Sequence, residues 1–182
     1  MTSVAGPFFA AVALLGAAGV AKVLRPRSTA RALRSAGFPA TPWWGRLLGI
    51  TEVVVVLAAV LAGGRVTALA VAACYLGFAV FTARLLLLAG DTSCGCFGEA
   101  DAPATPVHVA LNLAAAVSAG LAAGAPMPSL PRFLAHQPWA GAPFLALTAL
   151  LAWLGYVTLS LLPDLQAAAS GDGAGERAGR RP

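Results

Sequence analysis

The sequence predicts an all-α polytopic membrane protein that crosses the bilayer five times. Of its 182 residues, 59% are hydrophobic and only 10% are charged, whereas soluble domains carry about 25% charged residues. Five apolar segments also occur, each close to the roughly 20 residues that one helical crossing needs. We therefore expect a multi-pass protein of the cell membrane, in contact with the lipid bilayer. The net charge of +5 does not indicate a nucleic-acid partner, because the basic residues gather at the ends of apolar segments.

The first two predicted spans are separated by a basic connector. The first runs from about Val4 to Leu24, and no basic residue precedes it, so we expect a retained span rather than a removed signal peptide. The connector contains four arginines and then Pro39, Pro42, Trp43 and Trp44. The second span runs from about Arg46 to Leu61 and ends in a tight Gly63-Gly64-Arg65 turn.

The third and fourth spans flank the acidic loop of the chain. The third runs from about Val66 to Ala89 and the fourth from about Val107 to Ala123. The loop between them, from Gly90 to Pro106, holds Asp91, Glu99 and Asp101 together with the motif Cys94-Gly95-Cys96-Phe97-Gly98. A proline-rich link over residues 125–143 leads to a fifth span over 144–162. The tail, 163–182, lacks apolar periodicity, and we expect it to be disordered.

Successive antiparallel spans place several chemically active residues at one end of the bundle. The end of span one, the start of span two, the end of span three and the start of span four share this end. It therefore collects Lys22, Glu52, Arg84, Cys94, Cys96 and His108. Glu52 lies about 9 Å beyond Arg46 along a helix, and a carboxylate at that depth needs a partner, for which Lys22 and Arg84 are the candidates.

The pair Cys94 and Cys96 is the leading candidate for redox chemistry. A disulfide across one residue is strained, and strain makes it easier to reduce and exchange, while Gly95 relaxes the backbone demand. A nearby Lys22 or Arg84 would stabilise the thiolate that exchange requires. Capture of a soft metal by both cysteines and His108 is a second interpretation, although the spacing matches no zinc module. A third is that both cysteines are simply small loop residues.

Three further residues have both a functional and a structural interpretation. His108 could carry the proton that thiol exchange needs, or could lie solvated and idle at the headgroup level. Asn112, four residues later, points the same way. Glu52 is better explained by a helix-packing ion pair than by proton relay. Cys74, in mid-span, is expected to be structural, with a resolving thiol as the alternative.

The distribution of basic residues predicts an orientation. One end of the bundle collects Lys22, Arg25, Arg27, Arg31, Arg34, Arg46, Arg84, Arg177, Arg180 and Arg181, against Arg65 and Arg132 at the other. The positive-inside rule then places the cysteine loop on the cytoplasmic side.

The chain resembles the MauE family of methylamine-utilisation membrane proteins, which are related to DoxX-like membrane proteins. The resemblance rests on Gly19-Val20-Ala21-Lys22, the connector rising to Pro39, Glu52, Gly63-Gly64-Arg65 and, above all, Cys94-Gly95-Cys96-Phe97-Gly98. It covers roughly residues 4–124. It implies a four-helix transmembrane bundle, to which this chain adds a fifth transmembrane helix.

The resemblance also implies a function. Members that give the family its name are associated with maturation of a disulfide-rich enzyme subunit outside the cytoplasm. By analogy, Cys94 and Cys96 would exchange electrons with a thioredoxin-like or other redox protein and serve a client protein that needs disulfides. The resemblance places the cysteine loop outside the cytoplasm, whereas the distribution of basic residues places it on the cytoplasmic side. The side of the membrane on which the loop lies therefore stays open. A non-catalytic scaffold subunit of a redox complex and a soft-metal carrier are the alternatives. We predict no bound cofactor, and no quinone-binding signature is readable.

Overall fold

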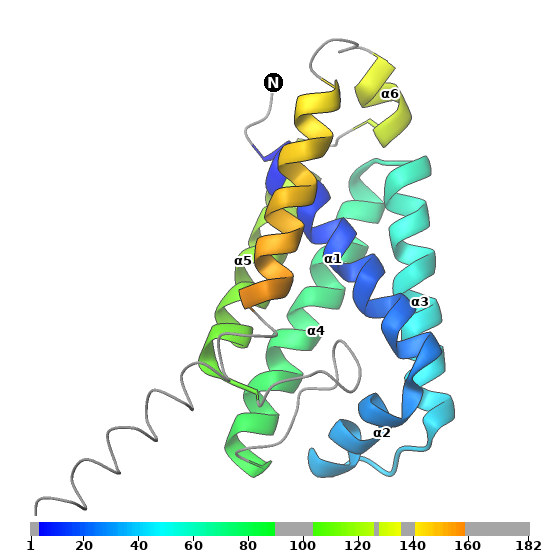
Figure 1. Ribbon diagram of the computed structural model, residues 1–182, viewed down its shortest axis with the longest axis vertical. Helices are drawn as coiled ribbons and strands as arrows, with labels where there is room; N and C mark the ends of the chain where they lie inside the picture. Colours follow the sequence, from blue (N-terminus) through cyan, green and yellow to red (C-terminus); the bar gives the residue numbers. More distant parts are fainter. Residues whose placement is uncertain (1–3, 90–103, 126–127, 136–140, 159–182) are drawn as a thin grey trace, which may run out of the picture.

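The computed structural model describes residues 4–89, 104–125, 128–135 and 141–158, and all regular secondary structure in these ranges is helical (Figure 1). The helices are α1 (Ala5–Leu24), α2 (Pro26–Ser35), α3 (Pro42–Leu61), α4 (Arg65–Ala89), α5 (Pro106–Gly124) and α6 (Leu130–Ala135). A further helix, Gly141–Thr158, follows α6. The cysteine pair and the tail 163–182 lie outside the described residues.

Five of the described helices are long and apolar enough to cross a membrane, which confirms the predicted spans. They are α1, α3, α4 (over Arg65–Leu88), α5 and the helix Gly141–Thr158. The second span begins earlier than predicted, because α3 starts at Pro42 rather than near Arg46. Proline is favoured at a first helical position, where its missing N–H costs nothing. Trp43 and Trp44 therefore belong to the first turn of α3, and both are exposed.

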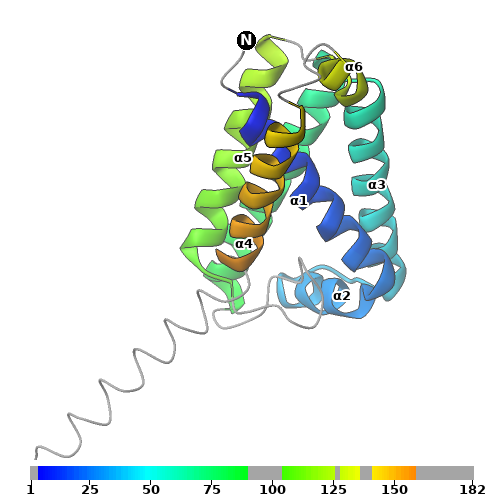
Figure 2. The ribbon, with the colours of Figure 1, turned by 45° about the horizontal axis from the view of Figure 1, so that its top comes forward.

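The basic connector contains a helix that the sequence analysis did not predict. α2 follows α1 after a single residue, Arg25, and begins with Pro26. It buries Ser28, Ala30 and Ala32 and exposes arginines on its other face. Figure 2 shows α2 lying across the end of the bundle rather than along it. A short helix with a strongly charged face and a small buried face is typical of the membrane interface.

The bundle is built from two helix pairs, α1 with α3 and α4 with α5. α1 also packs against α5, and this contact joins the two pairs. Its core contains Phe8, Phe9, Leu15, Val71 and Tyr75 together with many alanines. The Tyr75 hydroxyl donates a 2.6 Å hydrogen bond to the Ala11 carbonyl, so the polar tip of this buried ring is satisfied.

The two ends of the bundle differ in charge, as the sequence predicted. One end of the bundle lies at the bottom of Figure 1. It contains the whole of α2, the last turns of α1 and α4, and the first turns of α3 and α5. The Gly63-Gly64 turn and α6 lie at the opposite end. Gly63 and Gly64 have φ of 65° and 91°, a left-handed conformation that glycine adopts readily. Lys22 and the described arginines of the connector therefore share one end, away from Arg65 and Arg132.

The fifth spanning helix, Gly141–Thr158, packs against the outside of the bundle. The Phe144 ring lies 5.9 Å from Phe9 and 4.8 Å from Phe133, between ring centroids. Farther along, Gly155 faces Leu14 of α1 so closely that an added Cβ would lie 2.8 Å from Leu14 Cδ1. The fifth helix is thus an addition to a bundle that α1, α3, α4 and α5 build.

Candidate functional site

The candidate site begins where α1 and α3 cross at two glycines. A Cβ added to Gly49 would lie 2.6 Å from the Gly19 carbonyl oxygen, and one added to Gly19 would lie 3.0 Å from the Gly49 carbonyl oxygen. The two backbones therefore touch here, as small residues permit in membrane helices. Lys22 lies one turn beyond Gly19, and Glu52 lies one turn beyond Gly49. The crossing brings these two side chains together.

Lys22 and Glu52 form a buried ion pair. The Lys22 Nζ donates a 2.8 Å hydrogen bond to Glu52 Oε2, and the two side chains are only 3% and 1% exposed. The same ammonium lies 4.8 Å from the centroid of the Phe78 ring, a cation–π distance. Of the two partners predicted for Glu52, the structure selects Lys22. The second carboxylate oxygen, Oε1, is buried and accepts no hydrogen bond within the described part of the chain.

Arg84 has other partners than Glu52. Its Nε donates a 3.0 Å hydrogen bond to the Ala36 carbonyl, and its guanidinium carbon lies 5.2 Å from the Phe38 ring centroid. Arg84 therefore ties the end of α4 to the segment between α2 and α3. Its predicted effect on a thiolate stays a prediction, because Cys94 and Cys96 lie outside the described residues.

His108 occupies the first turn of α5 and is buried, with 3% exposure. The solvated interpretation of this residue is therefore wrong. The Thr105 backbone N–H donates to His108 Nδ1 at 3.2 Å, so this nitrogen acts as an acceptor and a neutral ring carries its proton on Nε2. The Asn112 amide donates a 2.8 Å hydrogen bond to the His108 carbonyl, which ties the two residues together on α5.

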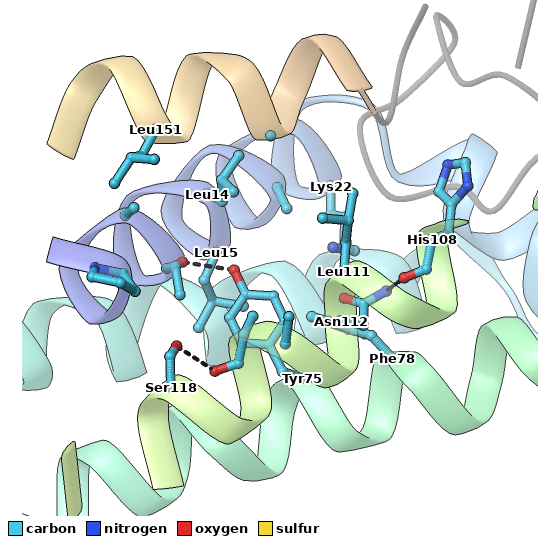
Figure 3. Close-up of a pocket in the computed structure, with 17 residues that line it drawn as sticks. Leu14, Leu15, Lys22, Tyr75, Phe78, His108, Leu111, Asn112, Ser118 and Leu151 are labelled. Atoms are coloured by element: carbon cyan, nitrogen blue, oxygen red, sulfur yellow. Dashed lines mark hydrogen bonds between the residues drawn. The ribbon is translucent and has the colours of Figure 1, made fainter. Parts of the chain in front are cut away.

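A cavity of about 330 Å³ joins Lys22 and His108 (Figure 3). Four helices line it: α1, α4, α5 and the fifth spanning helix. Figure 3 shows Lys22, His108 and Asn112 near one end, with Leu14 and Leu151 toward the other. Its volume is at the lower end of the roughly 300–1,000 Å³ range of small-molecule sites, and such sites are largely apolar with a few placed polar groups. We name it the Lys22–His108 cavity.

A second cavity, of about 510 Å³, lies on the Glu52 side of the ion pair. Lys22, Glu52 and Cys74 line it with Thr51 and a group of apolar residues. Lys22 therefore borders both cavities. Cys74 is a half-buried free thiol, and its place on this wall leaves both of its predicted roles open.

The chain enters α5 directly from the segment that carries Cys94 and Cys96. This segment begins after the end of α4, so its two ends are fixed at the end of the bundle where Lys22 and His108 lie. Within the described ranges, no cluster of three histidine, cysteine or acidic residues could hold a metal ion. The predicted soft-metal site of Cys94, Cys96 and His108 is not tested by this search, because both cysteines lie outside the described residues.

Residues 2–125 match the model of the family described as methylamine utilisation protein MauE. The chain belongs to the MauE family. The match spans α1 to α5, with Lys22, Glu52, Arg84 and His108, and also covers the sequence between α4 and α5 that includes Cys94 and Cys96. The helix Gly141–Thr158 lies outside it. The comparisons with curated proteins and with solved structures each gave no match.

Sequence reasoning missed two features of this MauE-family site. One is the glycine crossing: Gly45 and Gly49 have the small-residue spacing that signals close helix contact, and this signal was available. The other is the Lys22–His108 cavity, which lies among α1, α4, α5 and the fifth helix. No local pattern indicates it, because a cavity depends on how four distant segments pack.

Proposed function

We propose that this MauE-family protein is a membrane thiol–disulfide exchange protein that acts in methylamine utilisation. In this proposal, Cys94 and Cys96 alternate between a disulfide and a dithiol. The disulfide form accepts two electrons and two protons from a thioredoxin-like or other redox protein, which in turn oxidises two client thiols to one disulfide. The clients are proteins that need disulfides outside the cytoplasm.

The observation that carries this proposal is the buried ammonium of Lys22, which borders the Lys22–His108 cavity. Both lie at the end of the bundle to which the cysteine segment connects. Thiol exchange needs a thiolate and a group that moves a proton. Lys22 supplies a fixed positive charge, held by Glu52 at 2.8 Å, and His108 supplies a ring nitrogen that carries a proton. Family membership supports the same assignment, because the matched residues include the cysteine pair.

Cys96→Ala is expected to trap a partner. With Cys96 removed, a mixed disulfide between Cys94 and the partner has no neighbouring thiol to resolve it. Non-reducing gels of membranes from cells that express Cys96→Ala should show a new species of higher mass, which reductant removes. Cys74→Ser is the matched control, since it removes the half-buried cysteine and should leave the partner's redox state unchanged.

Two results would contradict exchange. If Cys96→Ala traps nothing and client thiols are oxidised as in the parent, the protein acts as a scaffold in a redox complex. If purified parent protein carries a soft metal that chelation removes together with function, the cysteines act as metal ligands.

A further inference from the structure

We propose that α2 forms a binding site for the phosphate groups of anionic phospholipids through Arg27, Arg31 and Arg34. This proposal does not depend on the proposed function. All three side chains are exposed, and positions separated by four and then three residues share one face of a helix. They extend over about 10 Å of that face, at a rise of 1.5 Å per residue. We name these three residues the α2 arginine stripe.

The structure holds α2 in place from both ends. At its start, a Cβ added to Gly45 of α3 would lie 2.7 Å from the Pro26 carbonyl oxygen, so the two helices touch there. Beyond its end, Arg34 Nη1 donates a 2.9 Å hydrogen bond to the Ala40 carbonyl. The opposite face of α2 is buried against the bundle. The stripe therefore has a fixed direction, away from the protein.

No carboxylate in the described ranges neutralises the stripe. Glu52 is the single acidic residue of those ranges, and it is paired with Lys22. Arg34 uses one of its five N–H donors on a backbone carbonyl, which leaves most of its guanidinium for another acceptor. A guanidinium binds phosphate oxygens through two parallel hydrogen bonds. Since residues one turn apart are neighbours on a helix surface, two members of the stripe can contact one phosphate.

The position of α2 selects a lipid headgroup as the source of this phosphate. One residue separates α2 from the spanning helix α1, and six residues separate it from the spanning helix α3. Because α2 lies across the end of the bundle (Figure 2), its exposed face is at the membrane surface. Trp43 and Trp44, in the first turn of α3, are 60% and 56% exposed, and tryptophan is enriched at headgroup level. Basic residues at this level are attracted to anionic lipids.

Binding is tested on the full-length protein in a non-ionic detergent. Phosphatidylglycerol is the probe, and phosphatidylcholine with the same acyl chains is the uncharged comparison. The rise in melting temperature across a titration gives the apparent affinity. We expect phosphatidylglycerol to stabilise the parent more than phosphatidylcholine does. Arg27→Gln/Arg31→Gln should weaken phosphatidylglycerol binding about tenfold or more and should unfold at the parent temperature in detergent alone.

Arg65→Gln is the matched control for the single variant Arg31→Gln. Each removes one exposed arginine and the same charge, but Arg65 lies at the opposite end of the bundle. Arg31→Gln should weaken phosphatidylglycerol binding several-fold, while Arg65→Gln should bind it as the parent does. Equal binding by Arg31→Gln and Arg65→Gln would overturn the proposal.

Two other occupants of the stripe give different results. If inorganic phosphate raises the melting temperature as much as phosphatidylglycerol, and Arg27→Gln/Arg31→Gln removes both effects, the stripe binds free phosphate and the lipid proposal is wrong. The proposal is also wrong if the double variant unfolds earlier in detergent alone and phosphatidylglycerol stabilises it as much as the parent. The arginines would then pair with acidic residues of this chain, such as Asp91, Glu99 and Asp101.

Discussion

Replacing Lys22 by methionine is expected to destabilise the protein by about 3–5 kcal/mol, the usual cost of leaving one member of a buried ion pair without its partner. Glu52 is 1% exposed, and Lys22 is its hydrogen-bond partner at 2.8 Å. Its other oxygen already lacks a partner among the described residues. Without Lys22 the whole carboxylate would be buried among apolar groups, where isolated charge is strongly unfavourable.

The double variant Lys22→Met/Glu52→Leu separates the pair from its members. Replacing both charges by apolar residues of similar size is often neutral or stabilising, so the double variant should recover most of the stability that Lys22→Met loses. Thermal unfolding in one detergent measures all three proteins, with Arg31→Met on the exposed face of α2 as the neutral control. A double variant as unstable as Lys22→Met would show that the pair is not the source of the effect.

Gly49→Ala is expected to cost about 1–3 kcal/mol, the range for forcing an extra methyl group into a packed interface. Its Cβ would lie 2.6 Å from the Gly19 carbonyl oxygen and 3.0 Å from Lys22 Cβ. The first neighbour is backbone, which cannot move aside as a side chain does. α1 and α3 would have to separate, and the Lys22–Glu52 pair would lengthen with them.

Gly77→Ala is the matched control for this prediction. An added Cβ at Gly77 would meet nothing within 4 Å in the described structure, and alanine is favoured over glycine inside a helix by about 0.5–1 kcal/mol. Gly77→Ala should therefore unfold at the parent temperature or slightly above it, while Gly49→Ala unfolds below it. Equal melting temperatures for the two variants would contradict the close crossing of α1 and α3.

The sequence predicted the spans well because each span depends on local composition. Runs of apolar residues bounded by glycine, proline and arginine marked all five helices, and the errors were at boundaries. α3 begins at Pro42, and α2 was missed because its ten residues are rich in arginine and serine rather than in apolar residues. Its helical character comes from packing against the start of α3, which the sequence does not display.

The candidate site was only partly predictable for the same reason. Antiparallel topology was enough to place Lys22, Glu52, Arg84 and His108 at one end. The choice of Lys22 over Arg84 as the partner of Glu52 depended on where α1 and α3 touch. His108 is buried in the folded bundle, which its position at the start of an apolar span did not reveal. Gly19 lies at the contact between α1 and α3, whereas a Cβ added to Gly77 would meet nothing within 4 Å in the described structure.

The orientation of the bundle links the structure to the proposed function. The end that carries α2, with its exposed Arg27, Arg31 and Arg34, is the end to which the cysteine segment connects. Basic residues favour the cytoplasmic side, whereas maturation of extracytoplasmic clients requires the cysteines outside. The proposed function therefore predicts that this protein departs from the charge rule.

Sided thiol labelling in intact cells tests the central claim most directly. The Cys74→Ser variant carries only Cys94 and Cys96, and a membrane-impermeant maleimide is applied before and after mild reduction. We expect labelling from outside only after reduction, which means an extracytoplasmic disulfide between the two cysteines. If both cysteines stay unlabelled until the cells are permeabilised, the loop is cytoplasmic, and disulfide maturation outside the cytoplasm is contradicted.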